Sequence, residues 1–175
     1  MVLKSSKQVS HKKDKYIDEP IKVKGYYAII LFLALLFLDR LTKVWATNLK
    51  ESIDLGFMAF AYTTNTGAGF SIFQNQNTLL AWIAVIALGL MIFFYDKFPK
   101  SGFILIITGI IGNLIDRVSY GYVIDFIDFK FWPVFNAADA FIFIGVVITI
   151  FVWIKEDKNT KKKKVKPRRN RKSRK

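Results

Sequence analysis

Aspartates stand out in residues 109–139 because that segment and both of its flanks are otherwise strongly apolar. The segment holds Asp116, Asp125, Asp128 and Asp139, together with Arg117, Asn113 and Asn136. Ionisable groups beside long apolar segments are costly to place, so by default they mark a functional site. Two carboxyl groups in different surroundings share a proton and divide acid and base work between them. The segment therefore predicts an acid-pair active site at one face of a membrane.

Asp125 and Asp139 have the contrasting surroundings that such a pair needs. Asp139 follows Asn136 by three residues at the predicted start of a helix, so a purely structural capping arrangement is the alternative to a functional role. The positive end of the helix favours ionisation of its carboxyl. Asp125 lies in a predicted loop among bulky apolar neighbours, where burial would raise the pKa of its carboxyl. We expect one carboxyl group to act as a base towards water and the other to donate a proton to the scissile carbonyl oxygen. An ion or proton pathway fits the same residues, and their spacing leaves both alternatives open.

The predicted third helix carries a stripe of small and polar residues. Its members recur at helical spacing and are Thr108, Gly109, Gly112, Asn113 and Asp116. Small residues let membrane helices approach closely, so the glycines predict helix packing. Asn113 fits either an interhelical hydrogen bond or the functional site. Asp116 lies near the C-terminal end of the helix, where the helix dipole disfavours a negative charge, and Arg117 is its nearest candidate partner.

Asp39 and Lys43 interrupt the end of the first apolar segment. They are four residues apart and share a helix face, as an acid–base pair does. For Lys43 we favour an ion pair whose long side chain extends towards the membrane interface. Asp39 lies deeper in the apolar segment and is the stronger candidate for a functional role.

The composition excludes several classes of protein. Hydrophobic residues make up 53% of the 175 positions and phenylalanine alone supplies 17, which argues against an ordinary soluble domain. Cysteine is absent, and His11 in a polar tail is the only histidine, so thiolate metal sites and His-based triads are not expected. The net charge of +14 comes from basic residues at the two ends of the chain. Beside apolar spans they predict attraction to anionic lipid rather than to nucleic acid.

The apolar segments predict a mainly α membrane protein with four transmembrane helices at about 26–45, 79–95, 102–115 and 137–153. The connection at 46–78 is too polar to span. Its runs at 57–62 and 70–72 predict strands of a small extracytoplasmic β-sheet on the membrane surface. We expect a membrane domain at 26–154 between basic cytoplasmic tails at 1–25 and 155–175, without a cleavable signal peptide.

Topology and charge agree on the orientation of this domain. Four spans put both basic tails on one side, together with the lysines of the turn at 96–101, so both termini are expected to be cytoplasmic. The polar residues of the spans then lie at one depth below the extracytoplasmic surface. A transporter would need them along a path across the membrane and is therefore disfavoured. A further alternative is a non-catalytic membrane adaptor whose basic tail binds acidic partners or RNA. This alternative would leave Asp125 and Asp139 without a role.

Five blocks of residues resemble the lipoprotein signal peptidases (signal peptidase II) in order and spacing. They are D-x-x-T-K at 39–43, NTGAGFS at 65–71, GNLIDR at 112–117, VIDF at 123–126 and FNAAD at 135–139. The resemblance covers residues 26–153. One departure is Gly69, where the family usually has alanine.

The resemblance implies an aspartic endopeptidase of the bacterial inner membrane. Such an enzyme removes the signal peptide from diacylglyceryl-modified prolipoproteins, cutting before the lipidated cysteine at the extracytoplasmic face. It implies that Asp125 and Asp139 are the catalytic pair. The substrate-binding or site-supporting residues would be Asp39, Lys43, Asn65, Asn113, Asp116, Arg117 and Asn136. We expect no metal or cofactor, a monomer, and prolipoprotein substrate and membrane lipid as the partners, without nucleic acid.

Overall fold

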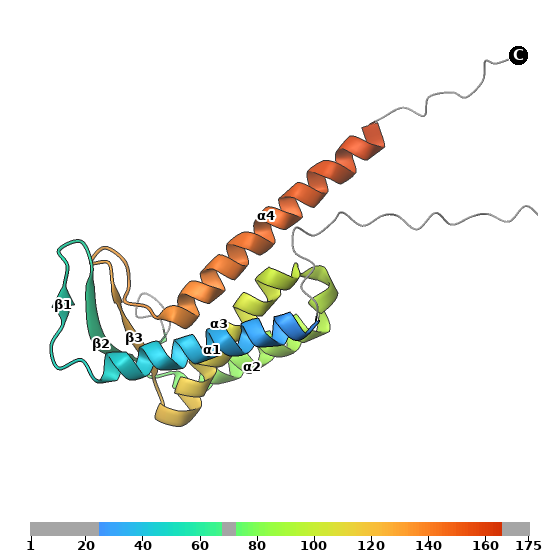
Figure 1. Ribbon diagram of the computed structural model, residues 1–175. Helices are drawn as coiled ribbons and strands as arrows, with labels where there is room; N and C mark the ends of the chain where they lie inside the picture. The colour runs from blue at the N-terminus through green and yellow to red at the C-terminus, as the bar shows by residue number, and fades with distance from the viewer. Residues whose placement is uncertain (1–24, 68–72, 166–175) are drawn as a thin grey trace, which may run out of the picture.

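The computed structural model describes residues 25–67 and 73–165 of the chain. This part is mainly helical, with a small sheet at one end of a helix bundle (Figure 1). The helices are α1 (Gly25–Thr47), α2 (Asn77–Phe93), the short 3-10 helix η2 (Tyr95–Lys97), α3 (Lys100–Tyr120) and α4 (Ala137–Val165). The strands are β1 (Ile53–Asp54), β2 (Ala59–Asn65) and β3 (Val123–Asp128). The predicted combination of helices and a small sheet is confirmed.

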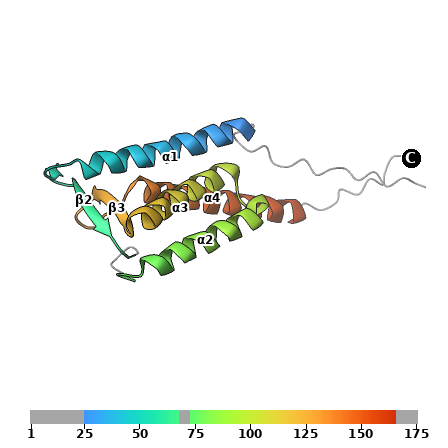
Figure 2. The same cartoon turned by 90° about the horizontal axis from the view of Figure 1, so that it is seen from below.

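The helices of the bundle alternate in direction. α1 and α3 run towards the sheet, whereas α2 and α4 run away from it (Figure 2). The start of α1 and the end of α4 therefore lie at the end of the bundle that is far from the sheet. α3 is the central helix, because it packs against α4, α1 and α2. The C-terminal end of α3 and the N-terminal end of α4 thus lie together beside the sheet.

Glycines allow α3 to approach its neighbours closely. A Cβ atom at Gly109 would lie 2.2 Å from the carbonyl oxygen of Ala138, and one at Gly112 would lie 2.8 Å from Oδ2 of Asp39. Side chains at these two positions would therefore collide with α4 and α1. The predicted small and polar stripe of α3 is buried as expected, including Thr108 and Asn113.

The bundle places apolar side chains outside and polar side chains inside, the reverse of a soluble protein. Phe37 and Phe151 are each 68% exposed, whereas Asp39 and Asp116 are completely buried. Within the described residues, α3 and residues 137–159 of α4 are long and apolar enough to cross a membrane. α2 is also apolar but has 17 residues, and α1 has 23 residues that include charged groups near its end. The described chain therefore has the surface and the long apolar helices of a membrane protein.

The sheet is antiparallel with strand order β1-β2-β3. Thr63 pairs with Asp125 and Asn65 pairs with Val123, so Asn65 and Asp125 are diagonal neighbours on one face. The prediction that Asp125 lies in a loop is wrong, because it lies in the middle of β3. The strand expected at 57–62 begins later and reaches Asn65, and the one expected at 70–72 lies outside the described residues.

Two helices extend further than predicted. α3 continues to Tyr120 and ends at Gly121, whose φ of 79° is the left-handed conformation that glycine adopts easily at a helix C-terminus. Asp116 and Arg117 therefore lie within the last helical turns. α4 continues to Val165, beyond the expected end at 153. It is held near its middle by the indole N–H of Trp153, which donates to the carbonyl oxygen of Lys97 at 2.8 Å.

Candidate active site

Asn136 connects the two acids that the sequence singled out. Its side-chain amide donates to Oδ1 of Asp125 at 2.6 Å, and its backbone N–H donates to Oδ2 of Asp139 at 3.2 Å. β3 brings Asp125 to this point, and the first turn of α4 brings Asp139. The structure thus places the two carboxyl groups, called the acid pair below, on either side of one asparagine.

A second amide binds each member of the acid pair. Nδ2 of Asn65, at the end of β2, donates to Oδ2 of Asp125 at 2.8 Å. Nδ2 of Asn113, on α3, donates to Oδ1 of Asp139 at 2.7 Å. Each carboxyl oxygen of the pair therefore accepts one N–H. Neutral donors of this kind orient a carboxyl group without neutralising its charge, so the pair retains its capacity to exchange protons.

The start of α4 fixes Asp139 locally. Oδ1 of Asn136 accepts the backbone N–H of Asp139 at 3.0 Å, while Oδ2 of Asp139 accepts the backbone N–H of Asn136. This reciprocal arrangement satisfies two of the backbone donors that a helix start leaves unpaired. The predicted capping role of Asn136 is confirmed, and the same side chain also reaches Asp125.

Asp125 is a buried acid with an altered proton affinity. Only 2% of the residue is exposed. Burial, followed by the negative charge of Asp139, raises the pKa of Asp125 to about 7. The amides of Asn65 and Asn136 and the positive charge of Lys43 act in the opposite direction. Asp125 therefore binds a proton in the pH range where an ordinary aspartate has lost it.

A set of four charged residues lies beside the acid pair and is called the ion cluster here: Asp39, Lys43 and Asp116, which are buried, and Arg40, which is half-buried. Asp39, Arg40 and Lys43 belong to α1 and Asp116 to α3. Nζ of Lys43 lies 2.7 Å from Oδ2 of Asp116 and 3.2 Å from Oδ2 of Asp39. Arg40 lies 2.6 Å from Oδ1 of Asp116 and 2.5 Å from Oδ2 of Asp39. The predicted pair of Asp39 and Lys43 is confirmed.

Two predictions about these residues are wrong. Lys43 does not extend to the interface, because it is only 2% exposed and its ammonium group is surrounded by buried acceptors. Asp116 pairs with Arg40 and Lys43 of the neighbouring helix rather than with Arg117. Both corrections have one cause. The close approach of α1 and α3 at Gly112 brings the cations of α1 within reach of Asp116.

Sequence reasoning missed Arg40. Besides its two acid partners, Arg40 donates to the carbonyl oxygen of Gly112 at 2.8 Å. The signal that could have revealed it is charge balance, because two buried acids need two cations. Lys43 alone would have left one of the acids without a compensating charge.

Arg117 lies close enough to the acid pair to interact with both of its charges, but its own hydrogen bonds are long. Its guanidinium group donates to the carbonyl oxygens of Gly67 at 3.3 Å and Asn113 at 3.5 Å, and its buried Nε has no hydrogen-bond partner in the described structure. Asn77, which the sequence did not single out, donates to the carbonyl oxygen of Arg117 at 3.1 Å and connects the start of α2 to this region. No group of three or more potential metal ligands occurs within 25–67 and 73–165.

A family model described as "Signal peptidase (SPase) II" matches residues 31–155, the part of the chain that contains every site residue described above. The chain belongs to the signal peptidase II family. The family predicted from the sequence blocks is thereby confirmed. This membership makes the chain a membrane-bound peptidase, in agreement with its apolar outer surface.

Known relatives agree with this membership. The lipoprotein signal peptidase of Clostridium tetani is 39% identical over 145 residues, which cover 74% of this chain and 93% of the relative. That of Halothermothrix orenii is 36% identical over 138 residues, covering 73% and 95%. Two solved structures, each of a bacterial membrane enzyme, are also similar. One has a TM-score of 0.70 at 26% identity, covering 86% of this chain and 96% of its own. The other has a TM-score of 0.65 at 30% identity, covering 75% and 94%.

Proposed function

We propose that this peptidase removes the signal peptide from diacylglyceryl-modified prolipoproteins, cutting before the lipidated cysteine, with Asp125 and Asp139 as its catalytic residues. The observation that carries the proposal is the double contact of Asn136, which binds both carboxyl groups. Aspartate is the acid–base residue that the described site offers, since the carboxyl groups of Asp125 and Asp139 meet at Asn136 and the chain has no cysteine. An acid pair is a sufficient set of groups for peptide hydrolysis.

The two acids have different tasks in this mechanism. Asp139 takes a proton from water, whose oxygen attacks the scissile carbonyl carbon. Asp125, which holds its proton up to about pH 7, gives that proton to the carbonyl oxygen. When the carbon–nitrogen bond breaks, Asp139 returns the proton from water to the leaving amine. The pair then reaches its starting state by transfer of one proton back to Asp125 from the new carboxyl group.

The amides and Arg117 support this chemistry. Asn65, Asn113 and Asn136 hold the carboxyl oxygens in place through the hydrogen bonds described above. The guanidinium group of Arg117 makes only long hydrogen bonds to backbone carbonyls. We assign it to a carbonyl oxygen of the substrate backbone, which a short charge-assisted hydrogen bond would bind firmly. Asp39 and Asp116 support the site through hydrogen bonds to its backbone, and Lys43 supports it through Asn113.

The proposal places the sheet and the acid pair at the extracytoplasmic side of the bacterial inner membrane. α1 to α4 would be four spans, with both tails cytoplasmic, where their basic residues meet anionic lipid. Both ends of the described chain point away from the sheet, which supports this orientation. Apolar outer faces of the helices, such as those with Phe37 and Phe151, would accept the acyl chains of the substrate. A monomer suffices, and no nucleic acid is needed.

The distribution of charge supports an enzyme over a transporter. The polar side chains that bind one another between α1, α3 and α4 gather at the end of the bundle beside the sheet, at the end of α1, the end of α3 and the start of α4. A transport path needs polar groups along the whole thickness of the membrane. The buried groups of α3 towards its start are Gly102, Ile104 and Ile106, which bind no ion.

The proposal is tested by removing one acid at a time. Asp125→Asn and Asp139→Asn keep the shape of the side chain but remove its proton exchange, so each should lower the cleavage rate by at least roughly 10³-fold. The assay follows the release of signal peptide from a diacylglyceryl-modified prolipoprotein by reconstituted enzyme.

Asp54→Asn is the matched control. Asp54 is an exposed acid of β1 that pairs with Lys130, away from the acid pair, so this variant should cleave at the wild-type rate. Near wild-type cleavage by either catalytic-site variant would show that the acid pair is not the catalytic group. Equal cleavage of unmodified precursor would contradict the proposed substrate class.

A further inference from the structure

The ion cluster is connected to the backbone beside each catalytic acid. Oδ1 of Asp39 accepts the backbone N–H of Ala138, the residue before Asp139, at 3.1 Å. Oδ2 of Asp116 accepts the backbone N–H of Ile124, the residue before Asp125, at 3.3 Å. The two acids of the cluster therefore hold the start of α4 and the start of β3. The geometry of the acid pair depends on charges that lie outside the pair.

Lys43 provides a third connection, through a side chain. Its Nζ donates to Oδ1 of Asn113 at 2.9 Å, while Nδ2 of the same amide donates to Asp139. An ammonium group has only donors, so it turns the oxygen of the amide towards itself and the nitrogen towards Asp139. Asn136 also donates to Oδ1 of Asn113, at 3.1 Å. Lys43 thus fixes the orientation of the amide that binds Asp139.

Arg40 has the same charge but different contacts. It binds Asp39, Asp116 and the carbonyl oxygen of Gly112, and these contacts join α1 to α3. None of its described contacts reaches an amide that binds the acid pair. The two cations of the ion cluster therefore differ in what they contact. Arg40 joins two helices, whereas Lys43 also binds an amide that holds Asp139.

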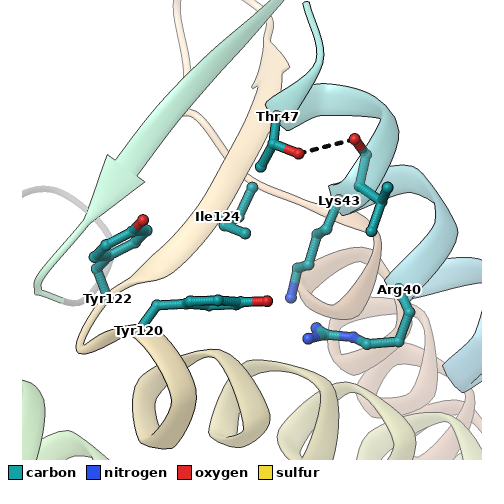
Figure 3. A pocket seen from close by; sticks show the side chains of 7 residues that line it. Arg40, Lys43, Thr47, Tyr120, Tyr122 and Ile124 are labelled. Carbon is teal, nitrogen blue, oxygen red and sulfur yellow. Dashed lines mark hydrogen bonds between the residues drawn. The ribbon is translucent and has the colours of Figure 1, made fainter.

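A cavity of about 270 Å³ is lined by Lys43 together with Arg40, Thr47 and Ile124. Figure 3 shows Arg40 and Lys43 entering it from α1, with Tyr120 and Tyr122 on the other side. Both cations are already paired with Asp39 and Asp116, so the cavity does not present a free positive charge to an anionic ligand. It leaves room for altered side chains at position 43.

We infer that Lys43 is a positioning residue of the proposed peptidase: it orients the Asn113 amide against Asp139 and supplies the positive charge that stabilises the ionised acid pair. Arg40, in contrast, holds α1 against α3. This inference rests on the proposed function, because it concerns how the same two acids are held ready for proton transfer. Lys43 itself does not touch the reacting atoms.

The charge of Lys43 has a measurable consequence. Asp125 meets the charges of Asp139 from α4, Lys43 from α1 and Arg117 from α3. Asp139 meets the same two cations. Loss of the Lys43 charge makes the ionised pair less favourable, so a higher pH is needed to free the base. The acid limb of the pH–rate profile should therefore move to higher pH. A residue with a purely structural role would not move it.

The experiment compares Lys43→Met with Arg40→Met in full-length, reconstituted enzyme. Lys43→Met should lower kcat by roughly tenfold or more with KM within about twofold, because a misoriented amide displaces the catalytic carboxyl. Its acid limb should rise by about one pH unit. Lys43→Arg, which keeps the charge, should leave the limb in place. Arg40→Met should lower the melting temperature and leave the acid limb where it is in the wild type.

A second variant covers the case in which Lys43→Met does not fold because it leaves a buried acid without a cation. The double variant Lys43→Met with Asp116→Asn removes one charge of each sign and should show a smaller shift in the same upward direction, because Lys43 is the nearer of the two to the Asn113 amide that binds Asp139. An unshifted acid limb in a folded variant would overturn the inference, and so would an equal shift in Arg40→Met. These outcomes differ from failure of the proposed function, in which Asp125→Asn or Asp139→Asn retains cleavage.

Discussion

The acid pair shows how two identical side chains acquire different chemistry. Asp139 lies at a helix start, where the backbone N–H of Asn136 and the positive end of α4 counteract the cost of burying its charge. Asp125 lies in a strand between Ile124 and Phe126, both buried, and its position there disfavours a charge. The difference follows from the elements that carry the residues and not from the residues themselves. It is the reason for assigning the proton donor to Asp125.

The pH dependence of catalysis tests this assignment. Asp125 acts as a donor only while protonated, and its pKa is raised to about 7, so kcat/KM should fall as the pH rises through about 7. The amide of Asn65 stabilises the carboxylate and lowers the pKa of Asp125. Removing it in Asn65→Ala should therefore raise that pKa and move the alkaline limb upwards. A pH–rate profile of both enzymes measures the two limbs. A downward move in Asn65→Ala would contradict the role of Asp125 as the acid.

At the scale of elements, the crossing of α3 and α4 controls the position of Asp139. Gly109 lies against the backbone of Ala138, which is adjacent to Asp139 in the chain. Asp39 holds the N–H of Ala138 from the other side. The first turn of α4 is therefore fixed between α1 and α3. A change in the distance between the helices would move the carboxyl group of Asp139 directly.

Gly109→Ala should consequently affect stability and catalysis together. Its Cβ would lie 2.2 Å from the carbonyl oxygen of Ala138 and 2.6 Å from Cγ1 of Ile142, so α4 must move away. We expect a loss of about 1–3 kcal/mol in the free energy of unfolding, measured by thermal or denaturant unfolding, and a clear fall in kcat.

Gly89→Ala on α2 is the matched control. A Cβ atom there meets no described atom within 4 Å, and alanine is the better helix former, so this variant should be as stable as the wild type or slightly more so. Equal stability of the Gly109→Ala and Gly89→Ala variants would contradict the close helix crossing.

At the scale of the whole molecule, an apolar exterior surrounds a polar interior that is confined to one end. Exposed residues such as Phe37 and Ile92 lie on different helices, whereas the buried charges of α1 and α3 meet beside the sheet. In a membrane this arrangement would separate lipid contact from the proposed catalytic site. It also requires the site to face one side of the membrane only.

The orientation can be measured with single cysteines, because the natural chain has none. Ser52→Cys, next to β1, should react with a membrane-impermeant thiol reagent in intact spheroplasts. Ser173→Cys, in the basic C-terminal tail, should react only after the membrane is permeabilised. Labelling of both in intact spheroplasts, or the reverse pattern, would contradict the proposed topology. Cleavage activity of each variant serves as the control for correct insertion.

The sequence by itself determined the helices, the presence of a small sheet, the family and the residues to examine. Apolar length and helical spacing are local properties, so they indicated α1 to α4 and the buried stripe of α3 without any tertiary information. Asn136 as a helix cap was equally local, since its partner is three residues away.

Only the tertiary structure decided which groups meet. Arg40 contacts Asp116 across 76 positions of the chain, and Asn65 contacts Asp125 across 60. Such contacts depend on how closely helices approach and how strands pair, which no local pattern specifies. For the same reason the strand position of Asp125, the burial of Lys43 and the double contact of Asn136 emerged only once the elements were packed together.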